Sequence, residues 1–256
     1  MSGTPRTPGV TASPRSGDAP PSAPDSAEEG PTVRPLSPSC TAALDQGEHA
    51  CLGISPFNGY FTTERITVLA RWALDRFSTV HLYMPDGPSA LTLEASGYPR
   101  RRAAAKARRQ ANYLRNKMIR ALDAVGVAEP QRMILDSGTL AGNRRYERLL
   151  GKAHVLFDAD AVFREACLNA GRWVLADRVE SAELTTERLG IAARYLLAEL
   201  PFFTHTPHIV GTASSVFCYH RPPEFVERVF QRRLPWRPHD GQGFVQLGLA
   251  PLEASE

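Results

Sequence analysis

The sequence is poor in cysteine and has no long apolar run. None of its four cysteines forms a C-x-x-C pair; they are Cys40, Cys51, Cys167 and Cys218. This spacing provides neither a zinc site nor a disulfide framework, so we expect reduced thiols and no bound metal. No stretch approaches the roughly 18 uncharged apolar residues of a membrane span, and the first forty residues lack the apolar core of a signal peptide. The sequence therefore predicts a cytoplasmic protein without membrane association.

Aromatic side chains are absent from residues 1–39, which contain nine of the 21 prolines together with many serines, glycines and alanines. Such a segment buries too little apolar surface to offset its ordering entropy. We expect a disordered tail over residues 1–39, followed by a single catalytic domain over residues 40–256.

From residue 40 onward, short apolar runs alternate with helical periods. The pattern predicts strands at 51–55, 80–84 and 132–135 and a helix at 66–77, an order that resembles βαβαβ. Crossover helices imply an α/β fold with a parallel sheet, and ligands then bind beyond the carboxyl ends of the strands, where Ser55 falls. Further helices are expected at 144–153, 159–176 and 186–200, the last one ended by Pro201. Late strands at 215–219 and 243–247 flank a helix near 223–231.

Acidic residues are absent between Arg100 and Arg120, a segment with nine of the 30 lysines and arginines. The whole chain carries a net charge of only +3, so its basic character is concentrated there. Periodicity from Pro99 to about Val125 predicts a helix with an apolar stripe opposite a cationic face. The stripe comprises Ala104, Ala107, Ala111, Leu114, Met118, Leu122 and Val125. The opposite face carries Arg102, Lys106, Arg109, Lys117 and Arg120, beside a second row of Arg101, Arg108 and Arg115.

Like charges three and four residues apart work against helix stability, so we interpret this pattern as functional rather than as an ordinary solvated face. A phosphate backbone is the usual target of such a row, and binding should depend strongly on salt. The pattern by itself leaves open tRNA, another nucleic acid or an anionic membrane surface, although a largely alanine stripe is weak for membranes.

Ser55 follows an apolar strand, as an ordinary turn residue or a nucleophile would. The G-x-S-x-G motif of hydrolases is absent, because Pro56 and Phe57 follow the serine. Tyr195 and Glu199 lie four residues apart among leucines, which predicts that both share one buried helix face. A buried carboxylate is costly unless it is paired, so Glu199 beside a phenol is a candidate for binding an amine or moving a proton.

Three separated motifs resemble the cyclodipeptide synthases, enzymes that make cyclic dipeptides from two aminoacyl-tRNAs. The signature H-x-x-x-G-(I/L/V)-S stands here as His49 to Ser55, and Y-(aliphatic)-x-x-E-(aliphatic)-P stands as Tyr195 to Pro201. The third stretch, Ser214 to His220, together with Asn58, is similar to the subgroup marked by Asn, Tyr and His at these places. The resemblance covers residues 45 to 250.

This resemblance implies a monomeric Rossmann-like fold similar to the catalytic domain of class I tyrosyl- and tryptophanyl-tRNA synthetases. The HIGH and KMSKS sequences with which those enzymes use ATP do not occur, so no ATP, metal or other cofactor is expected. Ser55 would be the nucleophile, and the product would form through an aminoacyl-serine and a dipeptidyl enzyme. Glu199 with Tyr195 would hold the first amino group and exchange protons with it, and Tyr219 would assist proton transfer during cyclisation.

The family pattern also implies residues that bind substrate. Asn58 and His220 would orient the second substrate, and Gly53 would leave room for the aminoacyl group. Cys51, Phe202 and Phe217 would line the pocket, whereas His49 is interpreted as structural. Contacts to tRNA would come from Arg101, Arg102, Lys106, Arg108, Arg109, Arg115 and Lys117.

Two other interpretations compete with this one. A nucleic-acid-binding protein that has lost catalysis would keep the basic helix but would not need Ser55, Tyr195, Glu199 and Tyr219 together. A serine acyltransferase acting on free esters or thioesters would leave the basic helix unexplained and lacks a convincing histidine base.

Overall fold

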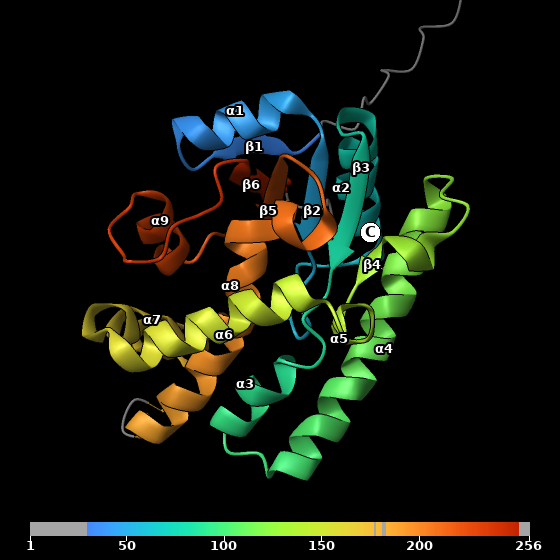
Figure 1. Ribbon diagram of the computed structural model, residues 1–256. Coiled ribbons are helices and arrows are strands. Elements are labelled where there is room, and N and C mark those ends of the chain that lie inside the picture. The colour runs from blue at the N-terminus through green and yellow to red at the C-terminus, as the bar shows by residue number, and fades with distance from the viewer. Residues whose placement is uncertain (1–29, 177, 181–182, 251–256) are drawn as a thin grey trace, which may run out of the picture.

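The computed structural model describes residues 30–176, 178–180 and 183–250 (Figure 1). In this part of the chain the first elements are β1 (Thr32–Pro35), α1 (Pro38–Gln46), β2 (His49–Gly53), α2 (Thr63–Arg76), β3 (Thr79–Tyr83), α3 (Ser89–Ala95) and α4 (Arg100–Ala124). There follow a 3-10 turn (Pro130–Met133), β4 (Ile134–Leu135), α5 (Ser137–Leu140), α6 (Arg144–Ala159) and α7 (Ala161–Leu175). The last are α8 (Thr186–Val210), β5 (Ser215–Tyr219), α9 (Glu224–Phe230) and β6 (Gln242–Gly248).

The sheet has the strand order β1-β6-β5-β2-β3-β4. All neighbours pair in parallel except β1, which runs antiparallel to β6 at the edge. The predicted α/β class with a parallel sheet is therefore confirmed. After β2 the chain crosses one face of the sheet through α2 to reach β3, and after β5 it crosses the other face through α9 to reach β6. Ligand sites in such sheets lie at the point between β2 and β5 where the two connections diverge.

Alternate side chains of the strands enter two different cores. Leu52, Leu82 and Val216 pack with α2 and α4 on one face, and Cys51, Tyr83 and Phe217 pack with α6, α7 and α8 on the other. Both faces of the sheet are thus covered, as a parallel sheet requires. Among the described residues, no helix is long and apolar enough to cross a membrane.

The domain begins before the predicted boundary at residue 40. Val33 and Arg34 pair with Leu247 and Gln246 in the sheet, and Ser37 caps α1 by accepting a hydrogen bond from the Cys40 amide (3.3 Å). A proline-rich composition did not exclude an edge strand, since Pro35 stands at its end and edge positions tolerate the missing donor. Residues 1–29 of the predicted tail lie outside the described residues.

The two longest helices differ from their predictions in one respect each. In α4, Ala103 is buried whereas Ala104 is exposed, so the apolar stripe is rotated by one residue at its start. The predicted end of α8 at Pro201 is wrong, because the helix continues to Val210 and departs from helical angles only at His205. The hydroxyls of Tyr146, Thr204 and Thr206 donate to three carbonyls of this stretch, at Ala198, Leu200 and Phe202. These hydroxyls add hydrogen bonds to carbonyls around the two prolines of α8, and burial on nearly all sides holds the helix together beyond Pro201.

Candidate active site

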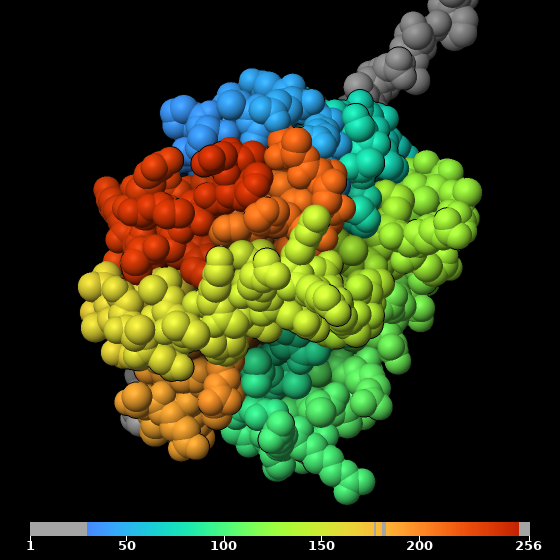
Figure 2. Space-filling view, viewed as in Figure 1, coloured from blue at the N-terminus to red at the C-terminus, as the bar shows by residue number. Residues whose placement is uncertain are grey.

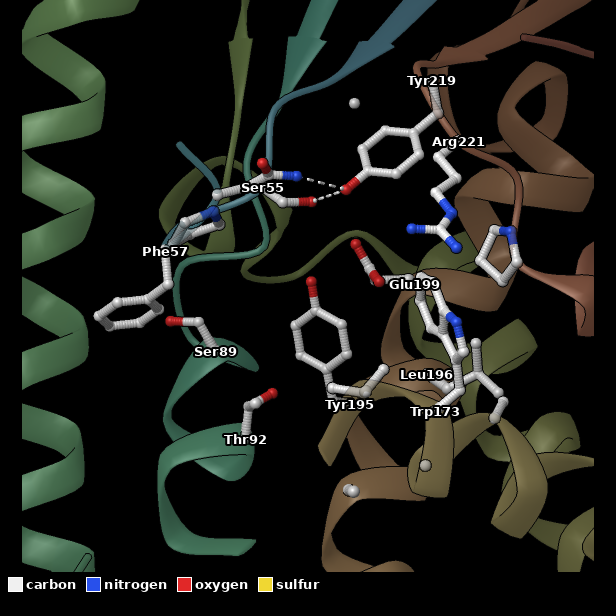
Figure 3. A pocket seen from close by; sticks show the side chains of 18 of the residues that line it. Ser55, Phe57, Ser89, Thr92, Trp173, Tyr195, Leu196, Glu199, Tyr219 and Arg221 are labelled. Atoms are coloured by element: carbon white, nitrogen blue, oxygen red, sulfur yellow. Dashed lines mark hydrogen bonds between the residues drawn. The ribbon is translucent and has the colours of Figure 1, made fainter. Parts of the chain in front are cut away.

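A cavity of about 900 Å³ opens at the carboxyl ends of β2 and β5, between α3, α7 and α8 (Figure 3). Ser55, Tyr195, Glu199 and Tyr219 all line it, although they are up to 164 residues apart in the sequence. The topology explains the convergence: β2 and β5 are parallel neighbours, so the segments that follow them meet at one edge of the sheet.

Ser55 lies two residues beyond β2, and its Oγ is 2.9 Å from the hydroxyl of Tyr219, the last residue of β5. The turn after the serine holds Phe57 at a φ of 61°, in the left-handed region that bulky residues rarely adopt. This conformation brings Asn58 back toward β5, where its Nδ2 donates to the Tyr219 hydroxyl at 3.4 Å.

Tyr195 and Glu199 lie one helical turn apart on α8, and both point into the cavity (Figure 3). Burial raises the pKa of Glu199 to about 8, although a hydrogen bond from Tyr195 opposes this shift. Glu199 is only 8% exposed, and most of its carboxyl is protonated at neutral pH. A carboxyl with a pKa near the working pH is suited to exchange a proton with an amine.

The phenols of the site remain protonated. Burial raises the pKa of Tyr219 to about 12, against the hydrogen bond with Ser55, which lowers it. Burial also raises the pKa of Tyr195 well above its usual range, and the neighbouring Glu199 adds to that shift. Neutral phenols can both donate and accept a hydrogen bond, so they can pass a proton between two oxygens.

His220 follows Tyr219 and stacks on Tyr60, with ring centroids 4.2 Å apart. Burial, together with Arg221 and Arg65, lowers the pKa of His220 to about 4, so the ring is neutral at pH 7. Its Nε2 accepts a hydrogen bond from Asn58 Nδ2 at 3.4 Å, which leaves the proton on Nδ1. This Nδ1 is buried and has no hydrogen-bond partner among the described residues.

Two predicted pocket residues do not line the cavity. Cys51 points into the core and is fully buried, and the ring of Phe202 stacks on Tyr83 with centroids 3.8 Å apart. Phe203, the next residue on α8, lines the cavity together with the predicted Phe217. A rotation of 100° per residue separates the two phenylalanines, and the sequence pattern was not fine enough to choose between them.

Gly53 lines the cavity as predicted, but the structure requires glycine there because of packing within the protein. A Cβ at this position would come within 2.7 Å of the Phe217 ring and 3.1 Å of the Tyr219 ring. Glycine therefore lets the aromatic side chains of β5 lie against β2. His49 lies outside the cavity, bound to Ser215 Oγ at 2.7 Å and to His81 Nδ1 at 2.8 Å, in agreement with its structural interpretation.

Sequence reasoning missed several residues of the cavity wall. Ser89 and Thr92 come from α3, Trp173 from α7, and Arg178 and Arg221 from the segments that follow α7 and β5. Trp173 is 49% exposed, and the Arg221 guanidinium lies 5.2 Å from the centroid of its ring. Of these, only Arg221 carried a signal in the sequence, because it directly follows the Tyr219–His220 pair.

The helix α4 lies along one side of the molecule, in the green region at the edge of Figure 2. Arg101, Arg102, Arg108 and Arg109 are exposed. Lys106 donates to the Tyr98 hydroxyl (2.9 Å) and Lys117 to the Phe61 carbonyl (3.3 Å), so both are partly engaged.

Arg115 differs from the other cations of this face, because it forms an ion pair with Asp136, whose side chain is 3% exposed. Within the part of the chain that the structure describes, no ion pair joins Arg101 or Arg108 to an acid. Arg115 therefore has a structural partner that the other two members of its row lack.

The described residues contain no group of three or more histidines, cysteines or acids arranged to hold a metal ion. All four cysteines are buried and free of disulfides.

Comparisons with known proteins agree with this architecture. A family model described as cyclodipeptide synthase matches residues 32–248. The cyclo(L-leucyl-L-leucyl) synthase of Bacillus subtilis is 31% identical over 218 residues, covering 82% of this chain and 87% of that protein. The cyclo(L-tyrosyl-L-tyrosyl) synthase of Mycobacterium tuberculosis is 29% identical over 220 residues, covering 85% and 75%.

Solved structures give the same relation. A cyclodipeptide synthase from Bacillus thermoamylovorans has a TM-score of 0.79 and 29% identity, covering 87% of this chain and 98% of that one. A Mycobacterium tuberculosis protein, whose structure relates cyclodipeptide synthetases to type I tRNA synthetases, has a TM-score of 0.77 and 27% identity, covering 88% and 95%. The predicted Rossmann-like fold, related to class I tRNA synthetases, is confirmed.

Proposed function

Since this chain belongs to the cyclodipeptide synthase family and is an enzyme of that class, we propose that it joins two aminoacyl groups, each delivered by a tRNA, into a cyclic dipeptide. The observation that carries the proposal is the 2.9 Å contact of Ser55 Oγ with the Tyr219 hydroxyl, in a cavity shared with Tyr195 and Glu199. The acyl group arrives already esterified, so the reaction needs no ATP, metal or other cofactor, and the enzyme acts as a monomer.

In the first step, Ser55 Oγ attacks the ester carbonyl of the first aminoacyl-tRNA. The new bond is a serine ester, the bond to the ribose oxygen breaks, and the serine proton ends on that oxygen. Tyr219 can relay this proton, because it lies within hydrogen-bonding distance of Ser55 and is a neutral phenol. One ester replaces another, so the step is nearly balanced and depends on positioning and proton transfer.

In the second step, the amine of the acyl group on Ser55 attacks the ester carbonyl of the second aminoacyl-tRNA. An amide forms, the second tRNA leaves with a proton on its ribose oxygen, and a dipeptide remains on Ser55. Attack in the opposite direction would leave the dipeptide on tRNA. The free amine of the dipeptide then attacks the serine ester, and Ser55 recovers its proton as the ring closes, with Tyr219 assisting the transfer.

Glu199 and Tyr195 hold the first amino group. With a pKa of about 8, a minor fraction of Glu199 is ionised at neutral pH, and this carboxylate accepts a proton from the bound ammonium and so releases the amine as a nucleophile. Tyr195, which interacts with both Ser55 and Glu199, orients the acyl group on Ser55 so that its amine reaches Glu199.

Asn58 and His220 orient the second substrate, as in the subgroup marked by Asn, Tyr and His. Support comes from the 3.4 Å contacts of Asn58 Nδ2 with both Tyr219 and His220. The unpartnered Nδ1–H of His220 is a buried donor that a substrate carbonyl would satisfy.

Mass spectrometry of the medium after expression in a bacterium tests the activity, since the host supplies every aminoacyl-tRNA. Wild type should release a cyclic dipeptide, and Ser55→Ala should release none while keeping its fold and its affinity for tRNA. Radiolabel from aminoacyl-tRNA should stay on wild-type protein at Ser55. Equal labelling of Ser55→Ala would contradict the covalent mechanism, and tRNA binding without any product would favour a non-catalytic protein.

The exposed cations of α4 bind the phosphates of the tRNA. Replacement of Arg102 or Arg109 by Ala should weaken tRNA binding and flatten the dependence of log affinity on log salt by about 0.7 to 0.9 units per contact. Filter binding at several salt concentrations measures both the tRNA affinity and its dependence on salt. Asp123→Asn is the control for non-specific charge effects, because Asp123 is exposed at the far end of the same helix and its loss makes the net charge more positive. Unchanged affinity and slope in both arginine variants would make this a solvated face.

A further inference from the structure

A second hollow of about 420 Å³ adjoins the cavity of Ser55, and Trp173 and Arg221 line both. The pair therefore stands between the two, and Figure 3 shows the Arg221 side chain beside Trp173 at the edge of the cavity. About half of the Trp173 surface (49%) is accessible, which is unusual for so large an apolar side chain. Neither residue has a role in the steps described above.

The charges of the two hollows differ. The cavity is lined by two arginines, Arg178 and Arg221, and by one carboxyl, Glu199, which is protonated at neutral pH. The second hollow is lined by Glu224 and Glu227, whose charges are balanced by Arg228 and by the shared Arg221. An anionic ligand is therefore favoured more strongly on the Ser55 side of the Trp173–Arg221 pair than beyond it.

An acyl donor attacked at Ser55 must extend its alcohol part out of the cavity, and the Trp173–Arg221 pair stands at one edge that this part can pass (Figure 3). In an aminoacyl-tRNA that part is the 3′-terminal nucleoside, which has an aromatic base and an adjoining phosphate. An exposed indole beside an arginine is the arrangement that binds single-stranded nucleotides, through base stacking and phosphate pairing. We propose that Trp173 and Arg221 form the site for the 3′-terminal nucleoside and its phosphate. The inference rests on the proposed use of aminoacyl-tRNA.

Binding of two RNA hairpins tests this site without any chemistry. Both carry a fluorescent label and the same acceptor-like stem, but only one ends in unpaired CCA. Wild type should bind the CCA hairpin more tightly, and Trp173→Ala or Arg221→Ala should each remove about tenfold or more of that preference. Arg102→Ala, on α4, should weaken both hairpins alike. Arg172→Ala is the matched control for lost charge, because Arg172 neighbours Trp173 on α7 but lines neither hollow.

A preference for CCA that persists in both variants would overturn the inference, as would the absence of any preference in wild type. Trp173→Phe keeps an aromatic platform and should retain most of the preference, which separates lost stacking from a disturbed fold. Formation of the cyclic dipeptide by wild type is measured in parallel. If wild type forms product but shows no CCA preference, or a preference that Trp173→Ala and Arg221→Ala leave unchanged, only the nucleoside site is wrong. If wild type forms no product, the proposed function is wrong.

Discussion

The helices α4 and α8 both contain 25 residues, yet they use their length in opposite ways. One face of α4 is buried and the other exposes cations to solvent, whereas most of α8 beyond Leu189 is buried and carries Tyr195 and Glu199 into the cavity. Amphipathic periodicity describes a helix at the surface well and a helix through the core poorly. In the proposed function the two helices divide the work, with the charge of α4 serving tRNA affinity and the shifted proton affinity on α8 serving the chemistry.

The largest effect is expected from Glu199→Gln on α8. The amide keeps the shape of the carboxyl but cannot exchange a proton, so the rate of product formation should fall by about 100-fold to 10,000-fold. Single-turnover assays at saturating aminoacyl-tRNA measure this loss. Glu187→Gln, exposed in the first turn of the same helix, is the control, and Arg109→Ala on α4 should regain the wild-type rate at saturation. A Glu199→Gln enzyme with near wild-type rate would remove the carboxyl from the mechanism.

Proline substitutions should affect the stability of the two helices unequally. Ala111→Pro in the middle of α4 removes a backbone hydrogen bond and introduces a clash, so the free energy of unfolding should fall by about 3 kcal/mol or more. Pro201→Ala in α8 loses some ring packing but regains an amide donor, and it should change that free energy by about 1 kcal/mol. Urea unfolding of the two variants measures both changes. An equal loss of unfolding free energy in Pro201→Ala and Ala111→Pro would mean that α8 depends on its prolines.

Within α4, Arg115→Ala should differ from Arg108→Ala. Loss of Arg115 leaves Asp136 buried with fewer partners, although Asp136 still accepts from the Thr139 amide at 2.9 Å. We expect the free energy of unfolding to fall by about 2 kcal/mol. Arg108 is exposed, and its loss should change that free energy by no more than about 0.5 kcal/mol. Thermal unfolding at low salt distinguishes them, and a stable Arg115→Ala protein would show that the ion pair contributes little.

The smallest expected effect is a slope of stability against pH. The unfolded chain ionises Glu199 near pH 4.5, whereas the folded protein keeps its proton up to about pH 8. The unfolded state thus binds fewer protons, so the free energy of unfolding falls as pH rises toward 8, by at most about 1.4 kcal/mol per pH unit. Burial lowers the pKa of His49 to about 3 and the pKa values of His205 and His220 to about 4, so these rings give the opposite slope, which fades only above about pH 7.5.

Comparison of wild type with Glu199→Gln between pH 7 and 8 isolates the carboxyl, because the histidines contribute equally to both proteins. Over this range the stability of Glu199→Gln should fall less, or rise more, than that of wild type, while Arg109→Ala on α4 should keep the wild-type slope. A parallel decline in wild type and Glu199→Gln would assign the pH dependence to another group.

Elements with a strong local pattern were predictable. The predicted strand at 215–219 coincides with β5, and α4 begins one residue after the predicted Pro99, because apolar runs and 3.6-residue periodicity are properties of neighbouring residues. The edge strand β1 was missed, since its pairing partner β6 lies more than 200 residues away. Pro201 was predicted to end a helix because local rules do not include the tertiary burial of residues 196–204, which holds α8 together across the proline.

Local spacing in the chain supplies the chemical groups of this protein: a serine after a strand, a phenol and a carboxyl one turn apart, and a row of cations on one helix. Which of these groups meet depends on how the strands and helices pack. Parallel pairing of β2 with β5 sets Ser55 against Tyr219, and burial against the sheet raises the pKa of Glu199. Contact and desolvation depend on residues far apart in the chain, so the rotation that selects Phe203 over Phe202, and the exposure of Trp173 beside Arg221, have no local signature.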